Sequence, residues 1–437
     1  MTSTLRRAGG FAAVGSLALA APALGRAAAV PFAAVALLAV FVVDSGPVFE
    51  LFARPGDYED RRLNGLAGFA LAATALGVLT ALPRVRLPVA VFVGTVLLLA
   101  YGNLGERLVG VRSSDPFVAV AGVAVAGFAA GLAAQAAVAV AQGGAVTVPR
   151  FAFLAGAGVL VAALLRSVLY ERDDPVVMLT SALLLWFFDG VAADVSGGEV
   201  AVALAVTVGF GYVAYRLGTA SVTGMLTGVL LGLLLIVFGG YGWFVVLITF
   251  FSVGGLSTKF RYDDKAERGV AEDNEGARGT GNVLGNAAVA LLAVLGFAAS
   301  GALPVPATAF RFAFAGSMAA AMSDTLSSEL GSLFDGPRLI TTFEPVPPGT
   351  DGGVTWQGEL FGVVGAALVA GVAVAALGFA APMRAAGVIV VGGFVGMTVD
   401  SLLGATLEGD RIGNEVVNFG ATLSGALVSA AAALLWL

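Results

Sequence analysis

Apolar segments of about 15 to 25 residues follow one another along almost the whole chain, separated by short polar segments. About 20 apolar residues in a helix cross the hydrocarbon core of a bilayer, so this pattern predicts a series of membrane-spanning helices. Strict alternation of apolar and polar positions, the pattern of a transmembrane β-barrel, does not occur. The sequence therefore predicts an all-α, polytopic membrane protein with about fifteen transmembrane helices.

The expected spans begin and end where the apolar runs do. They are residues 9–24, 27–43, 63–82, 87–101, 117–141, 151–165, 175–188, 200–215, 221–238, 243–256, 283–299, 307–323, 360–380, 386–399 and 416–435. The run at 243–256 is short, which leaves open a re-entrant segment there instead of a full span.

The distribution of basic residues predicts the orientation of these spans. With the N-terminus in the cytoplasm, 17 of the 23 Lys and Arg residues fall on the cytoplasmic side and 6 on the opposite side. Because cytoplasmic loops are enriched in Lys and Arg, we expect a cytoplasmic N-terminus in a protein of the cell membrane. The same arrangement puts the polar segments 257–282, 324–359 and 400–415 together on the cytoplasmic face.

Composition narrows the chemistry further. Hydrophobic residues make up 58% of the chain and charged residues only 12%, against about 25% charged in soluble domains, which excludes a soluble protein. The chain has no Cys and no His, so disulfides, thiolate nucleophiles, histidine bases and the usual zinc sites are excluded. Asp, Glu, Lys, Arg, hydroxyl and amide groups remain, together with a hard cation. The acidic excess with only two Lys fits a salt-loving, archaeal source.

The segment 257–282 combines charge with glycine. It holds 11 of the 52 charged residues, both lysines, and several glycines that lead into a span. Glycine lets backbone N–H groups approach a phosphate closely, and Lys and Arg add contacts to its oxygens. A loop that anchors to lipid head groups is the alternative. No P-loop motif is present.

Carboxylates mark the ends of two later spans. Asp324 and Glu329 lie in one segment and Asp400 in another, while Asp351 lies in a turn-rich connection with Pro and Gly. A carboxylate at the edge of a membrane is costly unless it is paired, hydrated or bound to a cation. Oxygen ligands of this kind suit Mg²⁺, although helix capping would also explain the first segment. A tunnel between the spans would hold a lipid tail.

Four strings carry a resemblance to a known family. They are FRYDDKAERGVAEDNEGARGTGNVLGN, SDTLSSELG, RLITTFEPVPPGTDGGVT, and VDSLLGATLE followed by GNEVVNF, in this order. They resemble the integral membrane family that includes plant phytyl-phosphate kinase and the animal transmembrane protein nineteen. The resemblance covers about residues 196–437, which implies a family-like membrane domain there and a membrane region of unknown role at 1–195. Positions that match its motifs are Lys259, Arg278, Asn282, Asp324, Glu329, Thr350, Asp351, Asp400 and Asn418.

The resemblance implies a kinase that converts an isoprenoid monophosphate of phytyl or geranylgeranyl type into the diphosphate. Its expected partners are membrane lipid, this monophosphate, a nucleoside triphosphate (CTP is our expectation) and the cofactor Mg²⁺, with no nucleic acid. We expect the Mg²⁺ ligands to be Asp324, Glu329 and Asp400. We expect the catalytic residues to be Asp324, Asp351 and Asp400. We expect the nucleotide-binding residues to be Lys259, Arg261, Arg278, Gly279, Gly281 and Asn282.

Two other classes of function stay open. A transporter or lipid flippase would use the membrane-edge carboxylates as ion or proton sites, and a nucleotidyl- or phosphoalcohol-transferase would use them with Mg²⁺. In the first half, the polar span end at 103–110 and the segment around Asp44 leave three interpretations: a degenerate duplication, a second lipid-binding half, or chance similarity.

Overall fold

The computed structural model describes residues 3–169, 174–191, 195–272, 276–409 and 411–436. Within these residues, twelve helices are long and apolar enough to cross a membrane, and the only strands are two of two residues each. The protein is therefore an all-α polytopic membrane protein, as predicted. The chain divides into two compact units, unit 1 at Met1–Leu204 and unit 2 at Ala205–Leu437, and the boundary falls inside helix α11.

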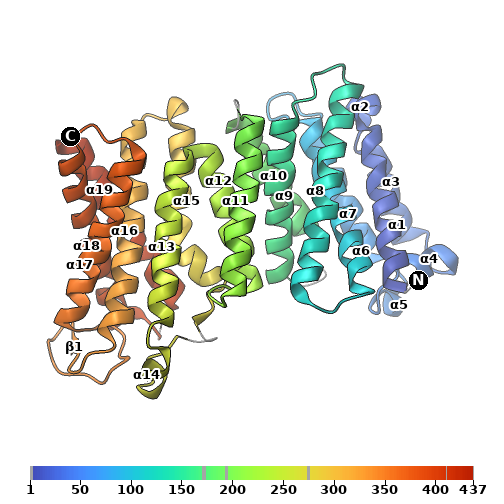
Figure 1. The fold of residues 1–437 in the computed structure, drawn as a ribbon. Coiled ribbons are helices and arrows are strands. Elements are labelled where there is room, and N and C mark those ends of the chain that lie inside the picture. The colour runs from blue at the N-terminus through green and yellow to red at the C-terminus, as the bar shows by residue number, and fades with distance from the viewer. Residues whose placement is uncertain (1–2, 170–173, 192–194, 273–275, 410, 437) are drawn as a thin grey trace. The chain divides into compact units, whose positions relative to one another are not determined.

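Unit 1 is built from helices of very different lengths (Figure 1). The short ones are α2 (Ala21–Leu24), α4 (Gly46–Phe52) and α5 (Asp57–Asp60), with 3₁₀ turns η1 (Ser16–Ala20) and η2 (Gly25–Ala27). The longer ones are α1 (Ser3–Gly15), α3 (Val30–Phe41), α6 (Asn64–Leu79), α7 (Val89–Gly110), α8 (Pro116–Ala141), α9 (Val148–Val168) and α10 (Asp174–Val191). Helix α11 (Gly197–Arg216) begins in unit 1 and ends in unit 2.

Unit 2 is a bundle of long helices with a small hairpin and a short helix at one end (Figure 1). Its elements are α12 (Val222–Gly239), α13 (Tyr241–Lys259), α14 (Tyr262–Glu267), α15 (Thr280–Ala298), η4 (Ser300–Ala302), α16 (Ala307–Gly331), β1 (Arg338–Leu339), β2 (Gly353–Val354), α17 (Trp356–Leu377), α18 (Pro382–Leu407) and α19 (Asn414–Trp436). The hairpin and α14 lie at the same end of the unit.

All fifteen expected spans coincide with helices in the structure, but three of these helices do not meet the criteria for a span on their own. The run at 27–43 becomes α3, which bends by 104° into α4. The run at 63–82 gives α6, which has only 16 residues and ends at Leu79, ahead of Pro83. Helix α16 has 25 residues but carries polar side chains on its last turns. Helix α13, where a re-entrant segment was an alternative, is a regular helix of 19 residues.

Helix α16 is the centre of unit 2 and packs against α13, α15, α17, α18 and α19. Small residues bring its backbone close to α18 and α19. A Cβ on Gly316 would lie 2.5 Å from the carbonyl oxygen of Gly425, and one on Gly396 would lie 2.3 Å from the Cβ of Ala320. Small residues that let helices approach so closely are typical of packing in membranes. This close packing fixes the positions of the polar side chains that follow on each helix.

The hairpin β1–β2 packs on the end of α18. Its register pairs Arg338 with Val354 and Leu339 with Gly353 in antiparallel orientation. Gly352 has φ of +73° and a Cβ there would lie 2.6 Å from the backbone nitrogen of Ala405, so only glycine fits this turn against α18. The predicted turn-rich connection is therefore an ordered hairpin at the same end as the polar ends of α16 and α18.

Candidate functional site

Arg278 is held in place by its backbone. Its N–H donates to the carbonyl oxygen of Thr219 at 3.1 Å, and its own carbonyl oxygen accepts from the N–H of Ser221 at 3.0 Å. Helix α12 lies directly against this bridge, because a Cβ on Gly224 would come within 2.0 Å of the Arg278 carbonyl oxygen. The segment just before α15 is thus fixed on the start of α12.

The guanidinium of Arg278 points into the bundle. The residue is 5% exposed, and its guanidinium lies 5.3 Å from the ring centre of Phe250 on α13. Gly254 leaves room for it, since a Cβ there would be 3.0 Å from Nη2. Among the described residues, Nε and Nη1 have no hydrogen-bond partner. A buried cation with two open donors is suited to an anion with several oxygens, such as phosphate.

Burial lowers the pKa of the Arg278 guanidinium from its ordinary value, and the negative charges of Glu272, Glu329 and Asp324 act in the opposite direction. Arginine stays protonated in proteins because the guanidinium has a very high intrinsic pKa. The side chain is therefore a permanent positive charge inside a partly acidic environment.

Asp324 on α16 and Asp400 on α18 lie close enough for their carboxyl groups to interact. Both residues are half-buried. In the described part of the chain, Oδ1 of Asp400 has no hydrogen-bond partner and is shielded from solvent. Two acceptors held together in this way require a shared proton or a cation between them.

Two buried amide oxygens lie in the first half of α15, a helix that packs against α16. Asn282 and Asn286 lie one turn apart on α15, and the Nδ2 of Asn286 donates to the backbone oxygen of Asn282 at 3.0 Å. Within the described residues, the Oδ1 atoms of both side chains are buried without a partner. On α19, the buried Asn418 donates from Nδ2 to Oδ1 of Asn414 at 3.1 Å. A Cβ on Gly285, next to Asn286, would lie 3.4 Å from the Cβ of Asn418, so the amide groups of α15 and α19 lie near each other.

These carboxylate and amide oxygens fit a Mg²⁺ ion that is also coordinated by phosphate. Mg²⁺ takes oxygen ligands, and it is commonly bound through one or two carboxylates plus water and substrate phosphates. In the described residues, no group of three acidic side chains could by itself hold a metal ion. Asp324 and Asp400, with the amide oxygens, match a site in which two carboxylates, water and substrate phosphates share the ion. They do not match a site in which the protein supplies all ligands.

Glu329 lies near this set but already has two partners. Its Oε2 accepts from Nζ of Lys265 at 2.5 Å, and its Oε1 accepts from the hydroxyl of Thr258 at 2.7 Å. The same Nζ also donates to the carbonyl oxygens of Ser257 at 2.8 Å and Thr258 at 3.2 Å. Lys265 therefore joins the end of α13 to the end of α16 through Glu329.

Lys259 and Arg261, the other basic residues expected to bind the nucleotide, are less buried than Arg278. Lys259 is half-buried, with Nζ 5.9 Å from the ring centre of Tyr262. Arg261 is exposed and forms an ion pair with Asp264. The structure thus gives the loop one buried arginine and one buried lysine, and neither is Lys259 or Arg261.

Gly279 and Gly281 lie at the start of α15. Gly279 is the residue before the first turn of this helix, and a Cβ on Gly281 would lie 2.9 Å from Oε1 of Glu415. Free backbone N–H groups at a helix start attract anions, and here the carboxylate of Glu415 lies beside Gly281. Residues 273–275 of the same loop lie outside the described residues.

Asp351 is exposed in the turn of the hairpin and lies near the end of α18, where a Cβ on Gly404 would be 3.7 Å from the Asp351 carbonyl carbon. Burial raises the pKa of the neighbouring Glu408, and the charges of Asp351, Asp324 and Glu415 raise it further. The hairpin therefore brings another carboxylate to the acidic end of α18.

Sequence reasoning missed four residues of this end of unit 2: Thr258, Lys265, Asn286 and Glu408. Asn286 had a detectable signal, because an amide one turn after Asn282 in an apolar span is unusual. Lys265 had none, since nothing local distinguishes it from Lys259 in the same charged loop.

Comparison with known proteins identifies the family. Residues 205–428 match the family described as Integral membrane protein DUF92. The chain belongs to this family. An uncharacterized membrane protein of Methanocaldococcus jannaschii is 36% identical over 211 residues, which are 47% of this chain and 82% of that protein. One from Synechocystis sp. is 34% identical over 203 residues, 44% of this chain and 76% of that protein.

The chloroplastic protein VTE6 of Arabidopsis thaliana is 32% identical over 209 residues, which cover 45% of this chain and 60% of VTE6. No solved structure matches the chain. The family region begins at residue 205, where unit 2 begins, and includes all of the candidate site.

Proposed function

We propose that the protein is a membrane kinase that transfers a phosphoryl group from a nucleoside triphosphate to an isoprenoid monophosphate, with Mg²⁺ as the cofactor. The main support is the buried Arg278 guanidinium with two donors open, next to the Asp324–Asp400 pair. The DUF92 family match and the motif resemblance to the family of plant phytyl-phosphate kinase support the same reaction.

In this reaction, an oxygen of the isoprenoid monophosphate forms a bond to the terminal phosphorus of the triphosphate. The bond from that phosphorus to its bridging oxygen breaks, and a nucleoside diphosphate leaves. Little covalent chemistry falls to the protein, which has to position the two phosphate groups and stabilise their charge.

Arg278 would donate from Nε and Nη1 to phosphate oxygens, and the start of α15 at Gly279 and Gly281 would add backbone N–H groups. Asp324 and Asp400, with the amide oxygens of α15, would hold Mg²⁺, which neutralises charge on the phosphates when bound. Lys265 and Glu329 would keep the ends of α13 and α16 together around Arg278.

The surroundings of the site support a lipid substrate. Its residues lie at the ends of helices in unit 2, where a polar head group and a membrane-embedded chain would meet. The excess of basic residues on the same side supports a site that faces the cytoplasm of a cell membrane.

The test uses purified full-length protein in detergent with phytyl or geranylgeranyl monophosphate, Mg²⁺ and each of CTP, UTP, GTP and ATP. We expect isoprenoid diphosphate and nucleoside diphosphate in equal amounts with at least one nucleotide. Arg278→Gln should lower the rate by about 10²–10³-fold, the range for loss of one donor to transition-state charge. Arg268→Gln is the matched control, because Arg268 is exposed and pairs with the exposed Asp335.

The absence of diphosphate with all four nucleotides, from protein shown to be folded, would refute the kinase. Release of pyrophosphate would instead indicate a nucleotidyltransferase. Loss of solute uptake in vesicles for Asp324→Asn, without any phosphoryl transfer by the unchanged protein, would indicate a transporter.

A further inference from the structure

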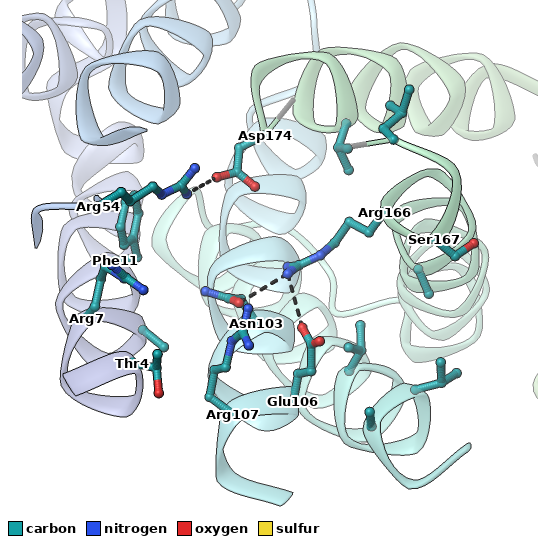
Figure 2. A pocket seen from close by; sticks show the side chains of 17 residues that line it. Thr4, Arg7, Phe11, Arg54, Asn103, Glu106, Arg107, Arg166, Ser167 and Asp174 are labelled. Atoms are coloured by element: carbon teal, nitrogen blue, oxygen red, sulfur yellow. Dashed lines mark hydrogen bonds and ion pairs between the residues drawn. The ribbon is translucent and has the colours of Figure 1, made fainter. Parts of the chain in front are cut away.

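Exposed aromatic side chains lie at the end of unit 2 that holds the candidate site. They belong to Phe260, Phe343 and Trp356, which are 54%, 66% and 72% exposed. The clustered charged side chains of unit 1 differ from them, because they face one another around a cavity, where Arg54 pairs with Asp174 and Arg166 with Glu106 (Figure 2). Large apolar side chains that are exposed together mark a surface that contacts a protein or a membrane.

Trp356 is the first member of an apolar stripe along α17. Trp356, Leu360, Val364 and Leu368 follow one another at intervals of four residues, and all four side chains are exposed. Residues four apart lie on the same face of a helix. Because α17 is long and apolar enough to cross a membrane, this stripe faces lipid, and it reaches the first residue of the helix.

Helix α13 indicates where the membrane ends beside this stripe. It packs antiparallel to α17, since a Cβ on Gly242 near its start would lie 2.3 Å from the carbonyl oxygen of Ala376 near the end of α17. Its 19 residues are about 28 Å long, close to the thickness of a hydrocarbon core. Exposed aromatic rings lie at both of its ends, at Tyr241 and Phe260. Because such rings gather at membrane–water interfaces, Tyr241 marks one interface, and Phe260 with Trp356 marks the other.

Phe343, in the hairpin before α17, has an unusual backbone conformation. Its φ is +60°, a value that a bulky side chain rarely adopts and that costs free energy. Its N–H donates to the carbonyl oxygen of Leu339 at 2.8 Å, and its carbonyl oxygen accepts from Nη1 of Arg338 at 2.7 Å. The N–H of Leu339 donates to the carbonyl oxygen of Glu344 at 3.0 Å. These bonds hold a large apolar ring in an exposed turn where glycine or asparagine would fit at a lower cost.

The hairpin connects Phe343 to Trp356. The turn with Phe343 follows β1, Trp356 comes two residues after the end of β2, and the two strands pair with each other. Residues 338–356 carry one basic and two acidic side chains, namely Arg338, Glu344 and Asp351. Attraction to anionic lipid therefore cannot hold this segment at a membrane, whereas burial of its aromatic rings can.

We propose that residues 338–356 form a membrane-surface anchor, in which the rings of Phe343 and Trp356 insert into the head-group layer of a phospholipid bilayer. Trp356 continues the lipid-facing stripe of α17 into this layer, and burial of the Phe343 ring there offsets the cost of its left-handed backbone. The anchor lies on the side of the membrane where the candidate site is found.

The anchor also determines the depth of one candidate site residue. The hairpin packs on α18, where a Cβ on Gly352 would lie 2.6 Å from the backbone nitrogen of Ala405, and the preceding residue is Asp351. A hairpin seated in the head-group layer places Asp351 where a membrane-embedded monophosphate presents its phosphate. This consequence rests on the proposed function, whereas the insertion itself does not.

The test uses the absence of cysteine from the chain, because a single introduced cysteine then carries a spin label at one known position. Thr341→Cys, at an exposed position of the hairpin, is labelled in the full-length protein in phosphatidylcholine nanodiscs. Electron paramagnetic resonance compares its collisions with O₂, which concentrates in lipid, and with a nickel chelate, which stays in water. We expect O₂ to dominate at this label and nickel to dominate at the control Glu267→Cys, which is exposed on α14.

Phe343→Asn removes the ring and suits the left-handed backbone, so its Tm in detergent should be no lower than that of the unchanged chain. In the Thr341→Cys chain, this variant should move the label toward water and raise its nickel collisions to the level of the control. Replacing part of the phosphatidylcholine by phosphatidylglycerol should leave the label where it is, because the hairpin is not basic. If Phe343→Asn does not fold, Phe343→Gly gives the same comparison.

Nickel collisions as frequent at the 341 label as at the 267 label would overturn the anchor, as would a label depth that Phe343→Asn does not change. A label shielded from both reagents would also overturn it, because a protein surface would then cover the hairpin. In the kinase assay with vesicles, Phe343→Asn should raise the KM for the isoprenoid monophosphate on the order of tenfold and leave kcat unchanged. Because label depth is measured without turnover, failure of the kinase would leave the result on the anchor unaffected.

Discussion

Nζ of Lys265 lies 2.5 Å from Oε2 of Glu329, although the two residues are 64 positions apart. The side chains are 1% and 6% exposed, so this is a buried ion pair. Lys265 also donates to the last carbonyl groups of α13. The pair therefore links the end of α13 to the end of α16, close to the Arg278 guanidinium.

Lys265→Met should destabilise the protein by about 3–5 kcal/mol, because the carboxylate of Glu329 would stay buried without its cation. Chemical unfolding in detergent measures the loss. Arg268→Gln breaks the exposed pair with Asp335 and should cost about 0–1 kcal/mol. Equal losses of unfolding free energy in the two variants would show that the buried Lys265 pair contributes no more to stability than the exposed pair.

Gly224→Ala should displace Arg278, since the new Cβ would come within 2.0 Å of its carbonyl oxygen. A shift of about 1 Å in a positioned group can cost on the order of 10²-fold in rate, and we expect a loss of that size in diphosphate formation. Gly228→Ala is the control one turn along α12, where a Cβ meets nothing within 4 Å. Normal activity in Gly224→Ala would mean that the position of Arg278 is not critical.

Asp400→Asn should raise the Mg²⁺ concentration needed for diphosphate formation and lower the rate on the order of 10²-fold, because it removes one of two carboxylates from the oxygen set. Chelation by EDTA should abolish the activity of the unchanged protein, and added Mg²⁺ should restore it. Glu267→Gln, at an exposed position on α14, serves as the control. An unchanged Mg²⁺ dependence in Asp400→Asn would remove Asp400 from the metal site.

Glu408 should make stability depend on pH. Its pKa is raised by burial and by neighbouring negative charges, so its ionisation is less favourable in the folded state than in the unfolded state. The stability linked to this group is present below its unfolded pKa of about 4.3 and is lost as the pH rises through the raised value.

Glu408→Gln removes this term, so its Tm should exceed that of the unchanged protein at pH 7 and approach it at pH 4. Thermal unfolding between pH 4 and 8 checks the trend. The exposed Glu344→Gln variant should follow the unchanged protein across the range. A Glu408→Gln profile parallel to that of the unchanged protein would contradict the assignment.

Apolar run length was sufficient to locate the helices, because a helix in a bilayer must satisfy its own backbone. It did not give the number of spans, because α3 bends into α4 at residues 42–45 and because α16 ends in polar turns. The all-α membrane fold was therefore predictable, whereas the role of α16 as the centre of unit 2 was not.

For the candidate site, charge placement pointed to the loop that contains the buried Arg278 and Lys265, and the proximity of Asp324 and Asp400 was expected from two carboxylates at span ends on one face. The sequence could not show that Lys265 and not Lys259 is the buried lysine, because Lys265 is held by an ion pair with Glu329, which lies in a distant segment. The sequence could not reveal the unpartnered donors of Arg278 either, since they depend on Phe250 and Gly254 lying beside its guanidinium.

The glycine contacts among α16, α18 and α19 also restrict where a substrate can go. With backbone atoms of these helices in direct contact at Gly316, Gly396 and Gly425, no isoprenoid chain can lie between them. A hydrocarbon tail attached to a phosphate near Asp324 and Asp400 has to leave along another face of α16. Selection for chain length would then be found among side chains of α13, α15 or α17, while these three helices act as a rigid wall.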